Sequence, residues 1–313
     1  MNASQHSASI KGHAAELGFD ACAVARAERI DPEHRLDEWL ESGYHADMDW
    51  LDRTKDVRQD VGLKLPGARS VVVVARNYHA QRPAAETDTG RVSRYAWGRD
   101  YHRVLRKPLR ALAERIESLV DGVQTYCCID SGPVLERFWA ARSGLGWIGK
   151  NSLVLRSGLG SWFFLGVIVT TLDIAPDAPV ADLCGACTRC IDACPTNAIV
   201  KPRVVDSRRC ISYHTIENRG DIPAGLHKDF DDWVFGCDTC QEVCPWNKDV
   251  PVTNVKDFHA RPGHAHPALE WLEEMDTETF TKAFAGTPVM RARLEGMKRN
   301  ASIVRANQHK HQK

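Results

Sequence analysis

Two cysteine-rich runs carry the spacing that holds iron–sulfur clusters. The first contains four cysteines within CGACTRCIDACP: Cys184, Cys187, Cys190 and Cys194. The second contains three within GCDTCQEVCP: Cys237, Cys240 and Cys244. The spacing C-x2-C-x2-C-x3-C-P wraps three thiolates around one face of a 4Fe-4S cube and sends the fourth to a neighbouring cube. Cys210 is the only cysteine between the runs, and it completes a predicted set of eight ligands for two clusters.

The fourth cysteine of each run crosses to the other cluster, which divides the ligands into two groups. One predicted group is Cys184, Cys187, Cys190 and Cys244, and the other is Cys194, Cys210, Cys237 and Cys240. A pair of structural zinc ions is an alternative, but zinc ligands usually come as two C-x2-C hooks. A disulfide framework is a second alternative, and it requires an oxidising compartment.

The elements that position these cysteines belong to a chain of 313 residues, which corresponds to about two domains. Its first residues lack an apolar signal segment, and its apolar stretches are too short to cross a bilayer, which predicts a cytoplasmic protein without a membrane partner. The 41 basic and 41 acidic residues cancel, so the molecule as a whole has no general attraction for nucleic acid.

Helices and strands alternate ahead of the cysteines, which predicts an α+β fold. The periodicity favours helices at 9–17, 31–40, 101–120 and 133–143, and strands at 21–25, 70–75, 123–129 and 162–171. This mixed α/β domain is expected over residues 1–173. A connector rich in proline and aspartate then leads into a ferredoxin-like two-cluster module at 174–250. A helical extension follows at 251–313, with short helices at 268–275 and 277–285.

Asp130 stands at the end of a predicted strand, where α/β domains present groups to a ligand. Its alternative role is to cap the helix that follows. The glycine-rich segment 144–152 follows a helix and lacks the P-loop motif, so we expect a loop that approaches a cofactor instead of a nucleotide site. His102 lies in DYHRVL, where Leu105 replaces the glycine of D-x-H-x-x-G, and we do not expect it to bind cobalt.

Two local concentrations of basic residues are candidate phosphate contacts. One is the C-terminal stretch 290–313, and the other is the stretch 201–209 before Cys210. Each is alternatively a solvated helix face or a basic tail. If they bind phosphates, binding is expected to weaken as the salt concentration rises.

The chain resembles the epoxyqueuosine reductases along nearly its whole length. The similarity lies in the stretches 44–50, 93–102, 130–137, 144–151, 184–195, 209–213 and 236–247. The resemblance implies that the N-terminal domain binds cobalamin and that the two clusters supply it with electrons. It also implies deoxygenation of the epoxide of epoxyqueuosine at the wobble position of tRNA, the last step in making queuosine.

The resemblance further implies roles for individual residues. Asp130 matches the family's proton donor, and burial against the corrin is expected to raise its pKa. The residues implied in cofactor binding are Arg58, Asp130, Gly149, Lys150, Asn151, Val154, Leu165 and Ser212. Because Ser212 is two residues from Cys210, the cluster held by Cys210 is expected to lie nearer the corrin.

The implied partners are a tRNA that carries epoxyqueuosine and a reductant such as a flavodoxin or ferredoxin system, and the chain is expected to be a monomer. Many relatives continue into a helical-repeat extension that grips tRNA, whereas this sequence ends at Lys313. Two outcomes are expected as alternatives: a weaker affinity for tRNA, or compensation by the basic tail and N-terminal surfaces. Two alternatives are a cobalamin-dependent reductive dehalogenase and a ferredoxin-like electron carrier fused to an unrelated domain.

Overall fold

A four-stranded antiparallel sheet forms the centre of the first half of the chain. The computed structural model describes residues 1–30 and 35–311, so the predicted helix start at Asp31 lies outside the described residues. The strands follow the order β1-β2-β7-β4 and span Ala21–Arg26, Ser70–Asn77, Phe163–Thr170 and Thr125–Cys128. The predicted strands are therefore confirmed to within a few residues.

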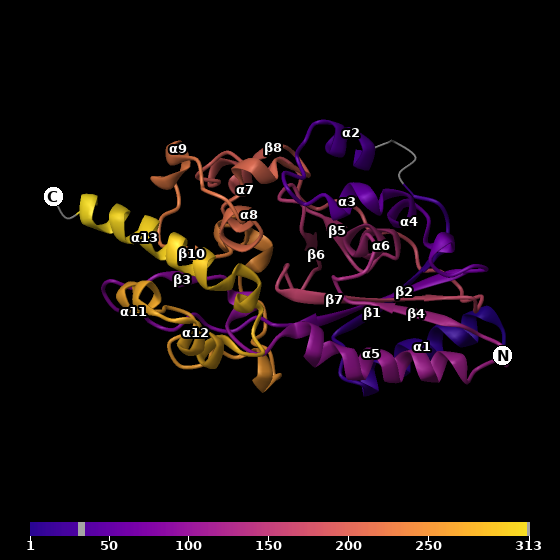
Figure 1. Ribbon diagram of the computed structural model, residues 1–313. Helices are drawn as coiled ribbons and strands as arrows, with labels where there is room; N and C mark the ends of the chain where they lie inside the picture. Colours follow the sequence, from indigo (N-terminus) through magenta and orange to yellow (C-terminus); the bar gives the residue numbers. More distant parts are fainter. Residues whose placement is uncertain (31–34, 312–313) are drawn as a thin grey trace.

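Helices cover both faces of this sheet (Figure 1). Helices α1 (Ala3–Glu16) and α5 (Tyr101–Glu117) lie on one face, and α6 (Glu136–Arg142) packs on the other. Strand β2 alternates between them, because Val72 and Val74 pack toward α1 and α5 while Val71 and Val73 pack toward α6. Burial on both faces explains why this strand is an uninterrupted run of valines.

The first helix begins earlier than the apolar periodicity predicts. Asn2 accepts a hydrogen bond from the backbone N–H of Gln5, and the Gln5 side chain accepts one from the backbone of Asn2. This reciprocal capping satisfies two backbone donors at the helix start. The helix therefore extends over Ala3–Glu16, although its first turn buries little apolar surface.

The remaining elements of the first half are short and lie above the sheet in Figure 1 or lead away from it. They are α2 (Arg35–Glu41), α3 (Trp50–Arg53), α4 (Lys55–Gln59), η1 (Val61–Leu63), β3 (Arg91–Val92), η2 (Arg94–Ala96), β5 (Trp147–Ile148) and β6 (Val154–Leu155).

The cysteine-rich region consists of short helices and hairpins. Its elements are α7 (Arg189–Asp192), β8 (Ile199–Lys201), β9 (Val204–Val205), η3 (Ser207–Arg209), α8 (Ile211–Ile216), α9 (Ala224–His227), β10 (Trp233–Phe235), α10 (Thr239–Glu242) and η4 (Pro245–Asn247). The extension adds η5 (Lys256–Phe258), α11 (Leu269–Glu274), α12 (Thr277–Phe284), η6 (Pro288–Ala292) and α13 (Arg293–His311). The two predicted short helices are confirmed as α11 and α12.

A second core joins parts of the chain that are distant in sequence. Strand β3 pairs in parallel with β10 of the cysteine-rich region. Trp97, Phe235 and Phe284 are fully buried in the same apolar cluster, together with Met297 and Val304 of α13. Residues from the first half therefore contribute to the packing of the extension, while the proposed boundary at residue 173 stays a prediction.

The C-terminal basic stretch is a packed helix, and the prediction of a basic tail is wrong for the described residues. Arg291 pairs with Glu217 at 2.7 Å, and Arg305 pairs with Glu273 at 2.5 Å. Arg299 donates to the backbone carbonyls of His214 and Asn218. Arg291 and Arg299 therefore fasten the extension to the cysteine-rich region, whereas Arg305 joins α13 to α11 within the extension.

Among the described residues, no helix combines the length and apolar character that a membrane span requires.

Candidate active site and cluster-binding residues

The eight predicted cysteines lie in the two groups that the crossing pattern predicts. Electrostatic coupling links Cys190 to Cys184, Cys187 and Cys244. The second set of couplings links Cys240 to Cys237, Cys210 and Cys194, and it also reaches Cys190 of the first group. All eight are free thiols in the structure. Burial raises the pKa of Cys210, so a nearby positive charge such as iron is needed to hold it as a thiolate.

The donor set suits a cluster better than a single ion. The cysteines of the first group line one pocket together with Lys150, Arg189 and Trp246. Four thiols at one hollow are the number of ligands that a 4Fe-4S cube takes, and the step of three residues between Cys184, Cys187 and Cys190 is the spacing that places three of them on one face of it.

We expect Cys210→Ser to lower the iron content from about eight to about four atoms per chain, because one of two four-iron cubes loses a ligand. Iron analysis and electron paramagnetic resonance of anaerobically purified protein measure this change. Cys22→Ser is the matched control, since Cys22 lies on β1 and burial raises its pKa to about 12. Unchanged iron in Cys210→Ser would remove Cys210 from the ligand set.

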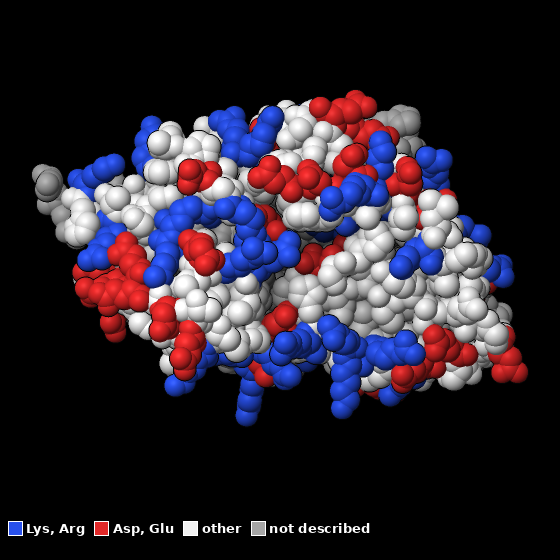
Figure 2. Space-filling view, viewed as in Figure 1, with Lys and Arg blue, Asp and Glu red and all other residues white. Residues whose placement is uncertain are grey.

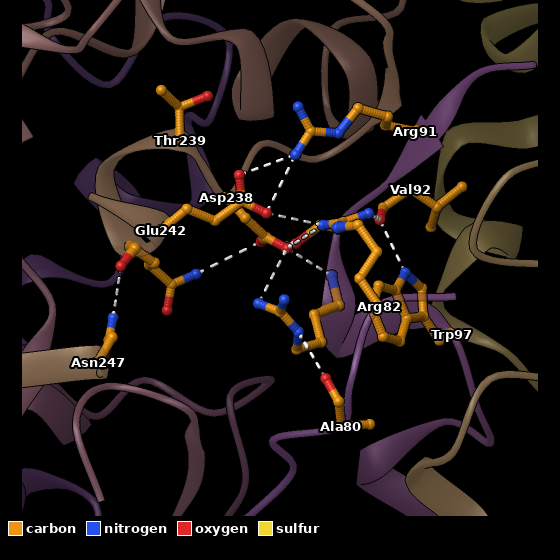
Figure 3. Close-up of polar contacts among 12 residues, drawn as sticks. Ala80, Arg82, Arg91, Val92, Trp97, Asp238, Thr239, Glu242 and Asn247 are labelled. Carbon is orange, nitrogen blue, oxygen red and sulfur yellow. Dashed lines mark hydrogen bonds and ion pairs between the residues drawn. The ribbon is translucent and has the colours of Figure 1, made fainter. Parts of the chain in front are cut away.

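A buried carboxylate anchors the loop of the second cysteine group (Figure 3). Asp238 is completely buried between Cys237 and Cys240 and accepts hydrogen bonds from Ser93 Oγ at 2.5 Å and from the Arg94 backbone at 2.8 Å. Arg82 donates to Asp238 at 3.1 Å and to Glu242 at 3.1 Å. This network connects the cluster loop to the segment around β3.

Two further contacts join the cluster module to the sheet domain. The Asn151 side chain donates to the Cys240 carbonyl at 3.4 Å. Asn247 accepts a hydrogen bond from the Ser161 backbone at 2.6 Å, beside Gly160. A Cβ at Gly160 would lie 2.0 Å from the Asn247 side chain, and its φ of +59° also favours glycine. The glycine therefore permits this close approach.

Asp130 lies where β4 ends, with its backbone in the left-handed region at φ 57°. Asp and Asn tolerate this conformation better than most residues. Its side chain is 67% exposed, yet burial by surrounding protein opposes its charge, which is typical of a group in a hollow. Tyr101 donates its hydroxyl to Asp130 Oδ2 at 2.6 Å, and His102 Nε2 lies 3.6 Å from the same oxygen.

The pKa of Asp130 differs from the prediction. Burial acts to raise it, as expected, but the hydrogen bonds with His102 and Tyr101 outweigh burial and lower the pKa. Burial also opposes the charge of His102, but the carboxylates of Asp100 and Asp130 raise its pKa to about 9. At neutral pH the protein therefore holds an Asp130 carboxylate beside a protonated His102.

A second carboxyl lies near Asp130 on the following helix. Burial raises the pKa of Glu136 to about 7, and the Cys128 thiol donates to it at 3.2 Å. Arg58 is buried and donates to Thr54 Oγ1 at 2.9 Å and to the Val134 carbonyl at 3.3 Å. Its guanidinium interacts electrostatically with Glu136 and Asp130, so Arg58 lies beside the candidate site.

The predicted cofactor loop lies between the sheet domain and the clusters. Lys150 donates to the Gly185 carbonyl at 2.8 Å beside the first cysteine group, whereas Asn151 contacts the second. Ser152 has φ 65°, and its hydroxyl and the Trp147 indole N–H are buried without a hydrogen-bond partner in the described structure. Such unsatisfied groups are costly unless a ligand or water completes them.

The other predicted contacts lie on different elements. Leu165 is the only partly exposed residue of β7, so it opens an apolar spot on an otherwise buried strand. Ser212 is partly exposed in the first turn of α8, directly after Cys210 and Ile211. Val154 is 4% exposed and packs in the core, and Gly149 and Asn151 are also buried, so Lys150 is the partly exposed member of the predicted contacts in this loop. The roles of all these residues stay predictions.

The face shown in Figure 2 is hollowed between the part that contains α8 and α13 and the part that contains the sheet. Basic side chains gather along the side of α8 and α13. Arg291 of η6 interacts electrostatically with Asp130, which connects the two sides of this region. Basic side chains beside the accessible Asp130 carboxylate suit a negatively charged substrate that brings one reactive group to this acid.

Sequence reasoning missed several residues around the site. Tyr101 and His102 lie at or near the end of the stretch 93–102 that resembles the family, but the sequence predicts no role for them next to Asp130. The sequence signal for their position is the start of α5. Asp100 is its N-cap, and a capped helix start fixes the direction of the first side chains, here Tyr101 and His102. Asp238 could have been noticed as a charged residue between two cluster ligands, but its partners Ser93 and Arg94 are distant in sequence.

Two family models match this chain and identify the class of protein to which it belongs. Residues 183–247 match the family model described as "4Fe-4S double cluster binding domain". Together with the sheet domain, this match defines a two-cluster iron–sulfur oxidoreductase. Residues 58–131 match a second model, described as "Epoxyqueuosine reductase QueG, DUF1730".

Relatives cover almost the whole chain. The epoxyqueuosine reductase of Synechocystis sp. is 44% identical over 89% of this chain and 96% of its own length. That of Vibrio cholerae is 41% identical over 98% of this chain and 85% of its own length. A solved epoxyqueuosine reductase with a tRNA-Tyr epoxyqueuosine-modified stem loop matches with a TM-score of 0.91 and 31% identity, covering 98% of this chain and 82% of that chain. The chain belongs to the epoxyqueuosine reductase family, which replaces both alternatives, a dehalogenase and a fused electron carrier.

Proposed function

We propose that the chain removes the epoxide oxygen of epoxyqueuosine at the wobble position of tRNA. The proposal includes electron delivery through both clusters to a bound cobalamin and protonation through Asp130. The observation that carries it is the position of Asp130, whose exposed side chain is held by the Tyr101 hydroxyl and lies beside His102. The solved relative with a modified tRNA stem loop supports the substrate, and a tRNA substrate locates the proposed activity in the cytoplasm.

The residues around the hollow are compatible with a corrin ring. Leu165 offers an apolar contact, and the unsatisfied Ser152 hydroxyl of the predicted cofactor loop offers a polar one. We assign the binding of cobalamin to the predicted set of Arg58, Gly149, Lys150, Asn151, Val154, Leu165 and Ser212. When bound, cobalamin supplies the reduced cobalt that opens the epoxide.

Side chains of the protein orient the acid and supply the proton for the reaction. Tyr101 holds Asp130 Oδ2 through its hydroxyl, so one carboxylate oxygen has a fixed direction. Asp130, which is a carboxylate at neutral pH, takes up a proton and delivers it to the oxygen that leaves, which prevents an unstable alkoxide from accumulating. Since the bases of tRNA stack, the modified nucleoside must be splayed out of the anticodon to reach this acid.

The cysteine groups suggest an order for the electrons. Asn151 of the proposed cofactor loop contacts Cys240, so we assign the inner position to the cluster of Cys194, Cys210, Cys237 and Cys240. The other cluster receives electrons from a reductant such as a flavodoxin or ferredoxin. We further propose that the chain acts as a monomer, with a catalytic domain at 1–173 and a cluster module at 174–250.

The test is anaerobic purification with added cobalamin, followed by reaction with tRNA that carries epoxyqueuosine. We expect mass spectrometry of the digested tRNA to show queuosine only when reductant is present. Protein that contains both clusters and the corrin but forms no queuosine would contradict the proposed function. Protein without corrin absorbance would contradict the cofactor while leaving the family assignment intact.

A further inference from the structure

Removing an epoxide oxygen as water requires more protons than one acid carries. The overall change consumes two electrons and two protons, and it converts the epoxide into a carbon–carbon double bond and one water molecule. One proton reaches the oxygen as the first C–O bond breaks, and the other as the second C–O bond breaks. Asp130 is a carboxylate at neutral pH and carries at most one proton at a time, so a proton must be supplied to it for each of the two steps. This inference rests on the proposed function.

His102 lies between two carboxylates. Its Nδ1 is 2.8 Å from Asp100 Oδ1, and its Nε2 is 3.6 Å from Asp130 Oδ2. A carboxylate only accepts hydrogen bonds, so Nδ1 must carry a proton to bond Asp100, and a proton on Nε2 pairs the positive ring with the Asp130 carboxylate at ion-pair distance. The arrangement therefore selects the imidazolium form of His102 through geometry.

Packing holds the ring in this position. Asp100 is the N-cap of α5, and the same Oδ1 accepts the backbone N–H of His102 at 3.0 Å. The Tyr101 ring stacks on the His102 ring with centroids 4.1 Å apart, and it stacks on Phe164 of β7 at 4.3 Å. The imidazole is thus fixed between the helix start and the sheet, with its Nε2 directed toward Asp130.

We propose that His102 is the proton reservoir for Asp130. After Asp130 has protonated the substrate oxygen, Nε2 of His102 returns a proton to Oδ2, and Asp100 retains the ring through Nδ1. The oxygen anion formed by C–O cleavage is a much stronger base than a carboxylate, so it draws the proton in this direction. His102 receives its next proton from solvent, since its side chain is 28% exposed. It acts through Asp130 and is a positioning and relay residue.

The surrounding charges are compatible with this relay. Asp100 and Asp130 are the carboxylates that face His102, and together they overcome burial to give it a pKa of about 9. Tyr101 donates to Asp130 and has its own pKa raised by burial, so it stays protonated. The remaining groups that act on Asp130 from other elements are Arg58, Tyr95, Glu136, Arg137 and Arg291.

The first experiment measures the proton on His102 without requiring turnover. Histidine ring resonances are titrated by NMR in wild type, Asp100→Asn and Asp130→Asn, with His102→Gln used to assign the signal. We expect a pKa of about 9 in wild type and a shift toward the ordinary value of 6.5 in either Asn variant. A wild-type His102 that titrates near 6.5 would overturn the proposal.

The second experiment measures turnover against pH in the enzyme with its cofactors. His102→Gln keeps a side chain that can hydrogen-bond to Asp100 but cannot relay a proton. We expect its kcat to fall roughly 10²-fold, with KM for tRNA unchanged. The wild-type kcat is expected to decline as the pH rises through about 9, where His102 loses its proton, and this decline is expected to disappear in the variant.

The outcomes separate the relay from the function. If His102→Gln keeps both the wild-type kcat and its decline at high pH while wild type forms queuosine, the relay is wrong and the function stands. If wild type with both clusters and corrin forms no queuosine, the function itself fails, and the NMR titration still decides whether the carboxylates hold His102 as an imidazolium.

Discussion

Replacing Asp130 with asparagine is expected to lower kcat by roughly 10²–10⁴-fold, the usual contribution of a general acid. The amide keeps the size of the side chain, and its oxygen can still accept the Tyr101 hydroxyl, but it has no proton to give. Anaerobic single-turnover conversion of modified tRNA measures the loss. Iron content and corrin absorbance are expected to match wild type.

Asp121→Asn is the matched control for this variant. Asp121 is exposed in the turn that precedes β4, at the opposite end of this strand from Asp130, so its replacement is the same chemical change away from the site. We expect wild-type turnover from Asp121→Asn. Wild-type turnover from Asp130→Asn as well would remove Asp130 from the mechanism, whereas loss of turnover together with loss of cofactor would show that the residue serves binding.

The second large effect concerns the buried network around the cluster loop. We expect Asp238→Ala to destabilise the protein by about 3–5 kcal/mol, because removing one partner of a buried ion pair leaves the other charge uncompensated. Arg82 and Arg94 are 17% and 9% exposed, so water compensates their lost partner poorly. Anaerobic urea unfolding of the holoprotein, followed by circular dichroism, measures the shift in midpoint.

Glu242→Ala tests whether burial is the cause. Glu242 pairs with Arg82 and Arg91 in the same network, but it is 30% exposed. Partly exposed pairs contribute up to about 1 kcal/mol, so this variant is expected to unfold close to wild type. Equal midpoints for Asp238→Ala and Glu242→Ala would contradict the importance of the buried carboxylate.

The sequence predicted best those features whose chemistry is local. Cysteine spacing predicted which cysteines lie near one another, because an iron–sulfur loop places thiols at fixed steps along one segment, while their role as cluster ligands stays a prediction. The valine run of β2 predicted a buried strand because burial on both faces requires an unbroken apolar sequence. The termini of α5 were found for a similar reason, since helical periodicity is a short-range pattern.

Features that depend on distant partners were not predicted. The lowered pKa of Asp130 results from two residues on another element, which position along the chain does not reveal. The basic C-terminal stretch suggested phosphate binding, but Arg291 and Arg305 meet Glu217 and Glu273 only after folding. The composition of a stretch gives its number of charged residues, but only the tertiary structure shows which of them form ion pairs.

The parallel pairing of β3 with β10 also affects how the molecule can be divided. A fragment that began at residue 174 would keep the cysteines but lose β3, Trp97 and the Ser93 hydroxyl that Asp238 uses. Its edge strand would then be unpaired, and unpaired edges promote association between chains. The cysteine-rich region and the first half of the chain therefore share a strand pair and an apolar core. We expect them to unfold in one transition, unlike two modules that a flexible linker connects.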